Sequence, residues 1–151
     1  MSALPVSALV VDCETTGLRA GTRLIELGAV WCSAGVLSGH WSAALDGSDD
    51  ASLRESLRAL RDRAWGRTVV MHNAGFDLRV LSSEAARVGV ENPVRSVLCT
   101  RRIAQRVMTG LSSFDLQTVA LALGIIEPVR HRALADAELT AKVYEALRSR
   151  G

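Results

Sequence analysis

Apolar and polar residues follow two different periods along the chain, and this pattern predicts a mixture of strands and helices. Short apolar runs that end at turn residues indicate strands, whereas apolar residues spaced three and four apart indicate amphipathic helices. The predicted strands are Val6–Val11, Leu24–Cys32, Val36–Leu45, Thr68–Met71 and Val94–Leu98. The predicted helices are Ser52–Ala64, Phe76–Val88, Thr100–Met108, Phe114–Leu123 and Ala133–Leu147.

The order of these elements, βββαβαβααα, limits the fold. Ser33-Ala34-Gly35 is a turn signal between two strands and predicts an antiparallel hairpin. The later strands are separated by predicted helices, which favours parallel crossover connections. The chain has 151 residues and shows neither repeats nor linkers. We therefore expect one α/β domain, residues 1–151, with a mixed five-stranded sheet flanked by helices.

Composition and charge exclude several classes of protein. Hydrophobic residues make up 48% of the chain, yet no apolar run approaches the roughly 20 residues that cross a bilayer. The N-terminus lacks the basic start of a signal peptide, so we expect a cytoplasmic protein without membrane contact. Three cysteines without a CxxC pair favour free thiols over disulfides or zinc. A net charge of +2 permits a local nucleic-acid groove.

Two carboxylates stand at the end of the first predicted strand. Asp12 and Glu14 are two residues apart, so strand geometry places both on one face and Cys13 on the other. A divalent cation would relieve the repulsion between them, and oxygen ligands of this kind suit Mg²⁺ or Mn²⁺. Taken alone, such a pair more often faces solvent without a ligand.

Three further residues gain meaning only in combination with this pair. Asp77 and Asp136 lie at predicted helix starts, where the helix dipole favours an acid without any catalytic role, and a lone loop histidine such as His131 is usually solvated. Strand ends and helix starts, however, converge at one end of an α/β sheet. Four carboxylates there fit hydrolysis by two metal ions about 3.5–4 Å apart, with a histidine as general base.

Three segments resemble, in order, the exonuclease motifs of the DEDD superfamily. They are VVDCETTGL (10–18), MHNAGFD (71–77) and HRALADA (131–137). The histidine five residues before the last aspartate resembles the DEDDh branch, which includes polymerase proofreading subunits, ribonuclease T and oligoribonuclease. IELGAV (25–30), LCTRRIAQRV (98–107) and LQTVALALGI (116–125) are similar to further segments of that family.

The resemblance implies a ribonuclease-H-like fold, two Mg²⁺ or Mn²⁺ ions, and 3′-to-5′ release of nucleoside monophosphates from single-stranded DNA or RNA. Carried over by position, Asp12, Glu14 and Asp136 would be direct metal ligands, Asp77 would hold the second metal through water, and His131 would be the general base.

The same resemblance implies contacts with the terminal nucleotide. The residues concerned are Thr15, Thr16, Leu18, Asn73 and Phe76. Backbone amides and an apolar wedge suit such a pocket, although Phe76 is more often helix core than stacking platform. Glu26, on a neighbouring strand, is expected to order the site rather than to react. For Arg130 and Arg132, phosphate contact and plain surface charge remain equally open.

The sequence departs from the family in places. Residues 46–68 lack the proline-containing segment and the "GI(T/S)" loop of many relatives, so we expect a more open groove. Cys99-Thr100 replaces a "DT" pair. The chain ends at Gly151 without a tail for a polymerase, which favours a free-standing exonuclease. A proofreading module that needs a polymerase partner and a non-catalytic nucleic-acid-binding domain are the alternatives, although no acidic position is lost.

Overall fold

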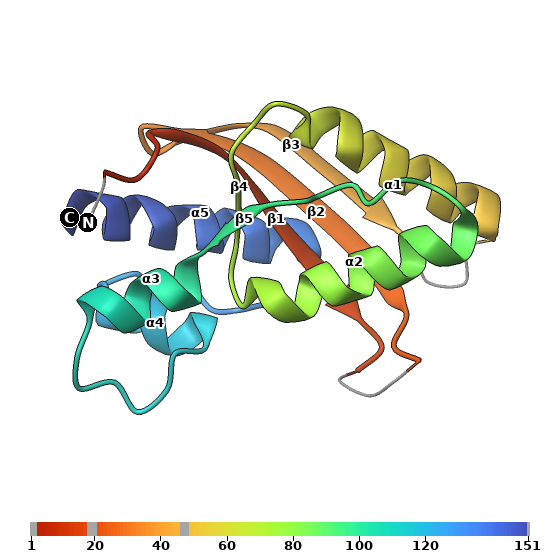
Figure 1. Cartoon of the computed structure of the whole chain (residues 1–151). Helices are drawn as coiled ribbons and strands as arrows, with labels where there is room; N and C mark the ends of the chain where they lie inside the picture. The colour runs from red at the N-terminus through yellow and green to blue at the C-terminus, as the bar shows by residue number, and fades with distance from the viewer. Residues whose placement is uncertain (1–2, 18–20, 46–48, 151) are drawn as a thin grey trace.

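The computed structural model describes residues 3–17, 21–45 and 49–150, which form a five-stranded sheet with helices on both faces (Figure 1). The strands are β1 (Ser7–Thr15), β2 (Leu24–Ser33), β3 (Val36–Ala44), β4 (Val69–Met71) and β5 (Val97–Cys99). The helices are α1 (Asp50–Ala64), α2 (Ala74–Val88), α3 (Thr100–Val107), α4 (Leu116–Ala122) and α5 (Ala133–Arg150). The predicted element order is confirmed.

The sheet is mixed, in the order β3-β2-β1-β4-β5. β1 pairs antiparallel with β2 and parallel with β4, and β4 pairs parallel with β5. Ala34 and Gly35 join β2 to β3 with φ angles of 50° and 80°, a two-residue turn whose left-handed backbone matches strand twist. The antiparallel hairpin followed by parallel crossovers is therefore confirmed.

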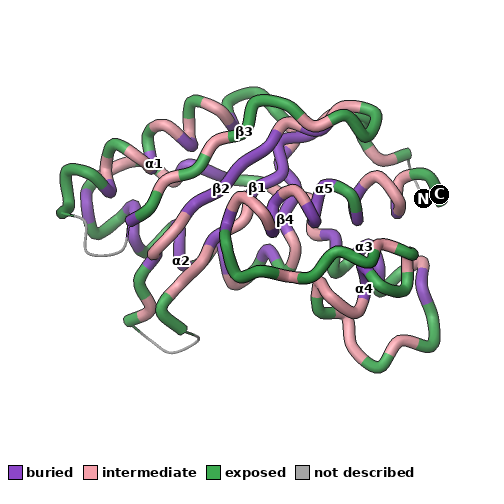
Figure 2. Tube along the Cα trace, turned by 180° about the vertical axis from the view of Figure 1, so that it is seen from behind, coloured by how far each residue is buried: buried purple, intermediate pink, exposed green. Residues whose placement is uncertain are grey.

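The two faces of β1 serve two separate hydrophobic cores. Leu9, Val11 and Cys13 pack with residues of α1 and α2, whereas Ala8 and Val10 pack with residues of α3, α4 and α5. Figure 2 shows the central strands β1 and β2 largely buried and the edge strand β3 largely exposed. The alternation continues beyond the apolar run, which leaves the side chains of residues 12 and 14 on the α5 face.

Several predicted boundaries are wrong, and the contacts of each segment explain the difference. β1 continues to Thr15 because it stays paired with β2, where Glu14 lies opposite Glu26. β5 begins at Val97 rather than Val94, whose backbone N–H is taken by the Asn92 side chain. Within the described ranges, no helix combines the length and apolar character that a membrane span requires.

Candidate active site

The first three carboxylates meet where two parallel strands end. β1 and β4 run side by side, with Val10 opposite Val70, so their carboxyl ends lie together. Asp12 and Glu14 occupy the end of β1, and α2 begins three residues after β4 ends. The first turn of α2 thereby brings Asp77 to the same place, where it is 7% exposed and accepts a hydrogen bond from the Cys13 backbone.

The fourth carboxylate comes from α5, whose start is fixed against β2. A Cβ atom at Gly28 would lie 2.4 Å from the Ala133 carbonyl carbon, so only glycine permits this close approach. Glu26 accepts a hydrogen bond from the Ala133 backbone N–H at 2.5 Å and forms an ion pair with Arg132 at 3.1 Å. Burial acts to raise the pKa of Glu26, but these contacts outweigh it and lower the pKa. Glu26 thus helps to position the start of α5.

One hydrogen bond and one left-handed backbone conformation characterise the segment that carries His131. The Arg130 backbone N–H donates to Asp136 Oδ1 at 2.8 Å, and Asp136 is 3% exposed. His131 has a φ of 55°, a left-handed conformation that costs a non-glycine residue about 1–3 kcal/mol and is sustained only by its surroundings.

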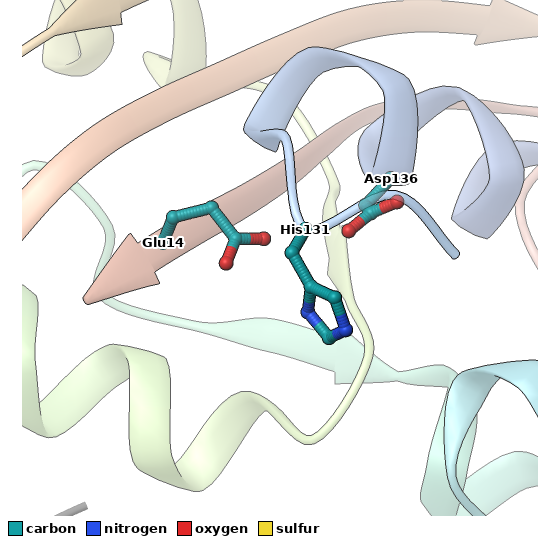
Figure 3. Close-up of side chains that lie close together, drawn as sticks. All are labelled: Glu14, His131 and Asp136. Carbon is teal, nitrogen blue, oxygen red and sulfur yellow. The ribbon is translucent and has the colours of Figure 1, made fainter. Parts of the chain in front are cut away.

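These elements bring Glu14, His131 and Asp136 together. One potential ligand atom of each residue lies within 4.8 Å of the others. Figure 3 shows the three side chains turned toward one space, from β1, from the loop before α5 and from α5 itself. Residues separated by more than 110 positions in the sequence therefore form one cluster.

Asp12 and Asp77 belong to the same cluster, because the charges of neighbouring carboxylates raise the pKa of each. Burial, followed by the negative charges of Asp77, Glu14 and Asp136, raises the pKa of Asp12 well above its usual value. Burial and then the charge of Glu14 raise the pKa of Asp77 to about 7, against the Cys13 hydrogen bond. Burial also raises the pKa of Glu14, while a hydrogen bond with Asp12 and the proximity of His131 oppose it. Four carboxyl groups thus crowd one poorly solvated site.

This cluster fits a divalent cation. Asp12 Oδ2 is buried and has no hydrogen-bond partner among the described residues. A buried acceptor without a donor costs about 1–3 kcal/mol. A hard cation such as Mg²⁺ or Mn²⁺ would satisfy this oxygen and offset the repulsion among the carboxylates. The geometry also leaves His131 close enough to be a ligand itself.

Four of the five predicted contacts with the terminal nucleotide lie at the end of β1, directly after it, or at the start of α2. Thr15 Oγ1 donates a hydrogen bond to the Gly17 carbonyl oxygen, and Thr16 Oγ1 accepts one from the Arg23 backbone N–H. Asn73 is exposed at the start of α2, with a φ of 58° and no side-chain cap. Phe76 is half-buried and packs against the hydrophobic core. Leu18 lies outside the described residues.

Sequence reasoning did not identify Glu84, which is 2% exposed in α2. It accepts hydrogen bonds from the Leu24 backbone and from the Arg23 guanidinium, both at 3.1 Å, and pairs with Arg87 at 3.0 Å. These contacts tie the start of β2, and the turn before it, to α2. Glu84 stands among the apolar positions of α2, and a charged residue at a position expected to be buried is the sequence signal that could have identified it.

Cys99 and Thr100 show what replaces the "DT" pair. The Ala74 backbone N–H, at the start of α2, donates to Cys99 Sγ at 3.4 Å. Thr100 Oγ1 lies 2.8 Å from His72 Nδ1, and His72 Nε2 lies 2.8 Å from the Phe114 carbonyl oxygen. Both residues therefore brace the segment that leads from β4 into α2 and to Asp77.

Comparison with known sequences identifies relatives of the chain. The sequence profile of the RNase T family, described as exonuclease, matches residues 36–144, a range that includes Asp77, His131 and Asp136. A protein of Mycobacterium tuberculosis named as a bifunctional exonuclease/endonuclease is 30% identical over 97% of the chain, which spans 27% of that protein. The DNA polymerase III subunit epsilon of Treponema pallidum is 27% identical over 94% of the chain and 76% of its own length.

Solved structures of exonucleases share the fold of this chain. The nuclease domain of 3′hExo, a DEDDh family member bound to rAMP, superposes with a TM-score of 0.78 at 13% identity, over 97% of this chain and 93% of that one. This likeness confirms the ribonuclease-H-like fold, and the profile match confirms the exonuclease-family resemblance over a range that holds the second and third motifs.

Proposed function

Because the chain belongs to the RNase T exonuclease family, we propose that it is a metal-dependent 3′-to-5′ exonuclease that releases nucleoside 5′-monophosphates from single-stranded nucleic acid. The observation that carries this proposal is the convergence of four carboxylates and His131, with an unpartnered oxygen of Asp12 buried among them. A structural cluster would gain nothing from four mutually repelling acids, whereas a cation site requires them.

The carboxylates divide between two cations in this proposal. Asp12, Glu14 and Asp136 would be direct ligands, and Asp77, the acid nearest the start of α2, would hold the second ion through water. Two divalent ions would activate a water molecule and stabilise the leaving 3′-oxygen. Burial of Asp77 and Asp136, at 7% and 3% exposure, keeps both carboxylates fixed in this arrangement.

His131 is the proposed general base. The attacking water forms a bond to phosphorus, the bond from phosphorus to the 3′-oxygen breaks, and the imidazole accepts the proton of the water. An exposed position at the edge of the cluster, within reach of Glu14, suits a group that must exchange protons with solvent. Metal ligation by His131 is the competing role, and it predicts a different response to substitution.

The terminal nucleotide would lie between the turn after β1 and the start of α2. Thr15 Oγ1 donates to the Gly17 carbonyl oxygen and the Thr16 N–H donates to the Arg23 carbonyl oxygen, so this turn forms a fixed wall. Asn73 is exposed at the start of α2. The solved relative bound to rAMP supports a pocket for one nucleoside monophosphate in this fold.

A second candidate function is a proofreading module that acts with a polymerase. The match to a polymerase III epsilon subunit over 76% of its length favours it. The chain spans about a quarter of the M. tuberculosis relative, so most of that protein lies outside the matched region. Robust activity of the isolated chain would separate a self-sufficient enzyme from a module that needs its partner.

One labelled strand in three forms tests the proposed substrate. The strand is presented alone, annealed as a blunt duplex, and closed into a circle, each with Mn²⁺. We expect rapid loss of the linear strand, slower loss of the duplex because unpairing an end costs a few kcal/mol, and no loss of the circle. Degradation of the circle at the linear rate would mean endonuclease action and would overturn the proposal.

A further inference from the structure

The exposed face of α3 carries three arginines without acidic partners, together with Gln105. Arg101, Arg102 and Arg106 are exposed, while Ile103 and Ala104 of the same helix are buried. Across residues 3–17, 21–45 and 49–150, none of these three arginines forms an ion pair. Six other arginines of the described ranges do: Arg23, Arg61, Arg87, Arg95, Arg132 and Arg148. Seven more form no ion pair there, but none of them stands on α3: Arg54, Arg58, Arg63, Arg67, Arg79, Arg130 and Arg150.

These three arginines line a cleft of about 780 Å³. Its other wall is the start of α2, at Asn73 and Gly75, and none of the described residues that line it is acidic. Figure 1 shows α3 lying beside the start of α2, the end of that helix that also carries Asp77. Gly75 and Asp77 are two residues apart in the first turn of α2, so the cleft and the carboxylate cluster lie on two sides of the same helix start.

We propose that Arg101, Arg102 and Arg106 bind the phosphodiester backbone of the strand whose 3′ end lies at the carboxylates. The identity of this ligand rests on the proposed function. Guanidinium groups match phosphate oxygens in pairs, and backbone contacts of this kind carry no base preference. Such contacts hold the strand behind its terminal nucleotide, so affinity should rise with strand length.

A second cleft does not offer the same chemistry. It has a volume of about 840 Å³ and lies beside α5, where Lys142 pairs with Glu127 and Glu145 pairs with Arg148. Its charges are already neutralised, whereas those of the α3 cleft are not. Of these two clefts, the α3 cleft is therefore the better suited to a polyanion.

The test compares two triple variants that lose the same charge. One is Arg101→Gln/Arg102→Gln/Arg106→Gln, and the control is Arg58→Gln/Arg61→Gln/Arg63→Gln, on α1. Binding of fluorescent dT2 and dT12 is followed by anisotropy in excess EDTA over a range of salt concentrations, so that no turnover interferes.

We expect the wild-type protein and the α1 variant to prefer dT12. The α3 variant should lose dT12 affinity at least tenfold and lose its preference over dT2. The slope of log K against log salt should fall by up to about 2, since each phosphate contact on a single strand contributes about 0.7. An unchanged preference and slope, or an equal loss in the α1 variant, would overturn the inference.

Cleavage of unlabelled dT12 with Mn²⁺ is measured on the same preparations. Arginine-dependent binding without any cleavage by the wild-type protein would reject the proposed function and leave the backbone site standing. Cleavage by the wild-type protein, together with binding that does not depend on the three arginines, would support the proposed function and reject the backbone site.

Discussion

Replacing Asp77 by asparagine should stabilise the metal-free protein at alkaline pH while it removes activity. Burial and the charge of Glu14 raise the pKa of Asp77 from 3.8 to about 7. Between about pH 4 and pH 7, Asp77 is therefore protonated in the folded protein but already ionised in the unfolded chain. Stability falls as pH rises through that window, and the full cost of ionising Asp77 is present above it. An asparagine at this position never carries that cost.

The size of the effect follows from the same shift. A rise of about three pK units corresponds to about 4 kcal/mol of unfavourable ionisation, which sets a ceiling. Loss of the favourable interaction between the Asp77 charge and the start of α2 acts in the opposite direction by less than about 1 kcal/mol. We expect Asp77→Asn to raise the free energy of unfolding by about 1–3 kcal/mol at pH 8, and by almost nothing at pH 4.

Urea unfolding followed by circular dichroism in EDTA measures this difference at pH 4, 6 and 8. Asp62→Asn, at an exposed position on α1, is the matched control and should leave the free energy of unfolding unchanged at each pH. Added Mn²⁺ should stabilise the wild-type protein more than Asp77→Asn, which narrows the gap. An Asp77→Asn protein that is less stable than wild type at pH 8 would refute the reasoning.

Two further substitutions address other parts of the account. Gly28→Ala places a methyl group against the backbone of Ala133 and should lower the free energy of unfolding by at least about 2 kcal/mol in urea. Gly75→Ala, which has open space around it, is the control and should not lower it. Equal effects of the two substitutions would show that α5 does not depend on this close approach. His131→Ala should lower kcat by about 10²–10⁴-fold while calorimetry finds Mn²⁺ binding retained; joint loss of both would make His131 a ligand instead.

Much of the fold could be predicted because local patterns determine it. Apolar periodicity located all ten elements in order, and Ala34-Gly35 marked the hairpin. Boundaries were harder to predict because they depend on partners distant in sequence. The end of β1 at Thr15 is set by pairing with β2, and the start of α2 at Ala74 follows Asn73 in a left-handed conformation without a side-chain cap.

Only part of the candidate site could be predicted from the sequence, for the same reason. Asp12 and Glu14 could be placed on one face because strand periodicity is local. The contacts that hold α5 could not be foreseen, since Glu26 and Ala133 are separated by 107 positions and Gly28 gives no local signal of a close approach. Proximity of the five residues follows from the fold, while their chemical roles stay predictions.

The central claim is that the carboxylate cluster is a cation site for removal of 3′-terminal nucleotides. Its most direct test follows release of mononucleotide from a strand labelled at its 3′ end, with Mn²⁺ or with EDTA, by wild-type protein and by Asp12→Asn. The account predicts that labelled mononucleotide is the first product with Mn²⁺, and that EDTA or the substitution each abolishes it although the variant stays folded. Release in EDTA, or undiminished release by Asp12→Asn, would contradict the account.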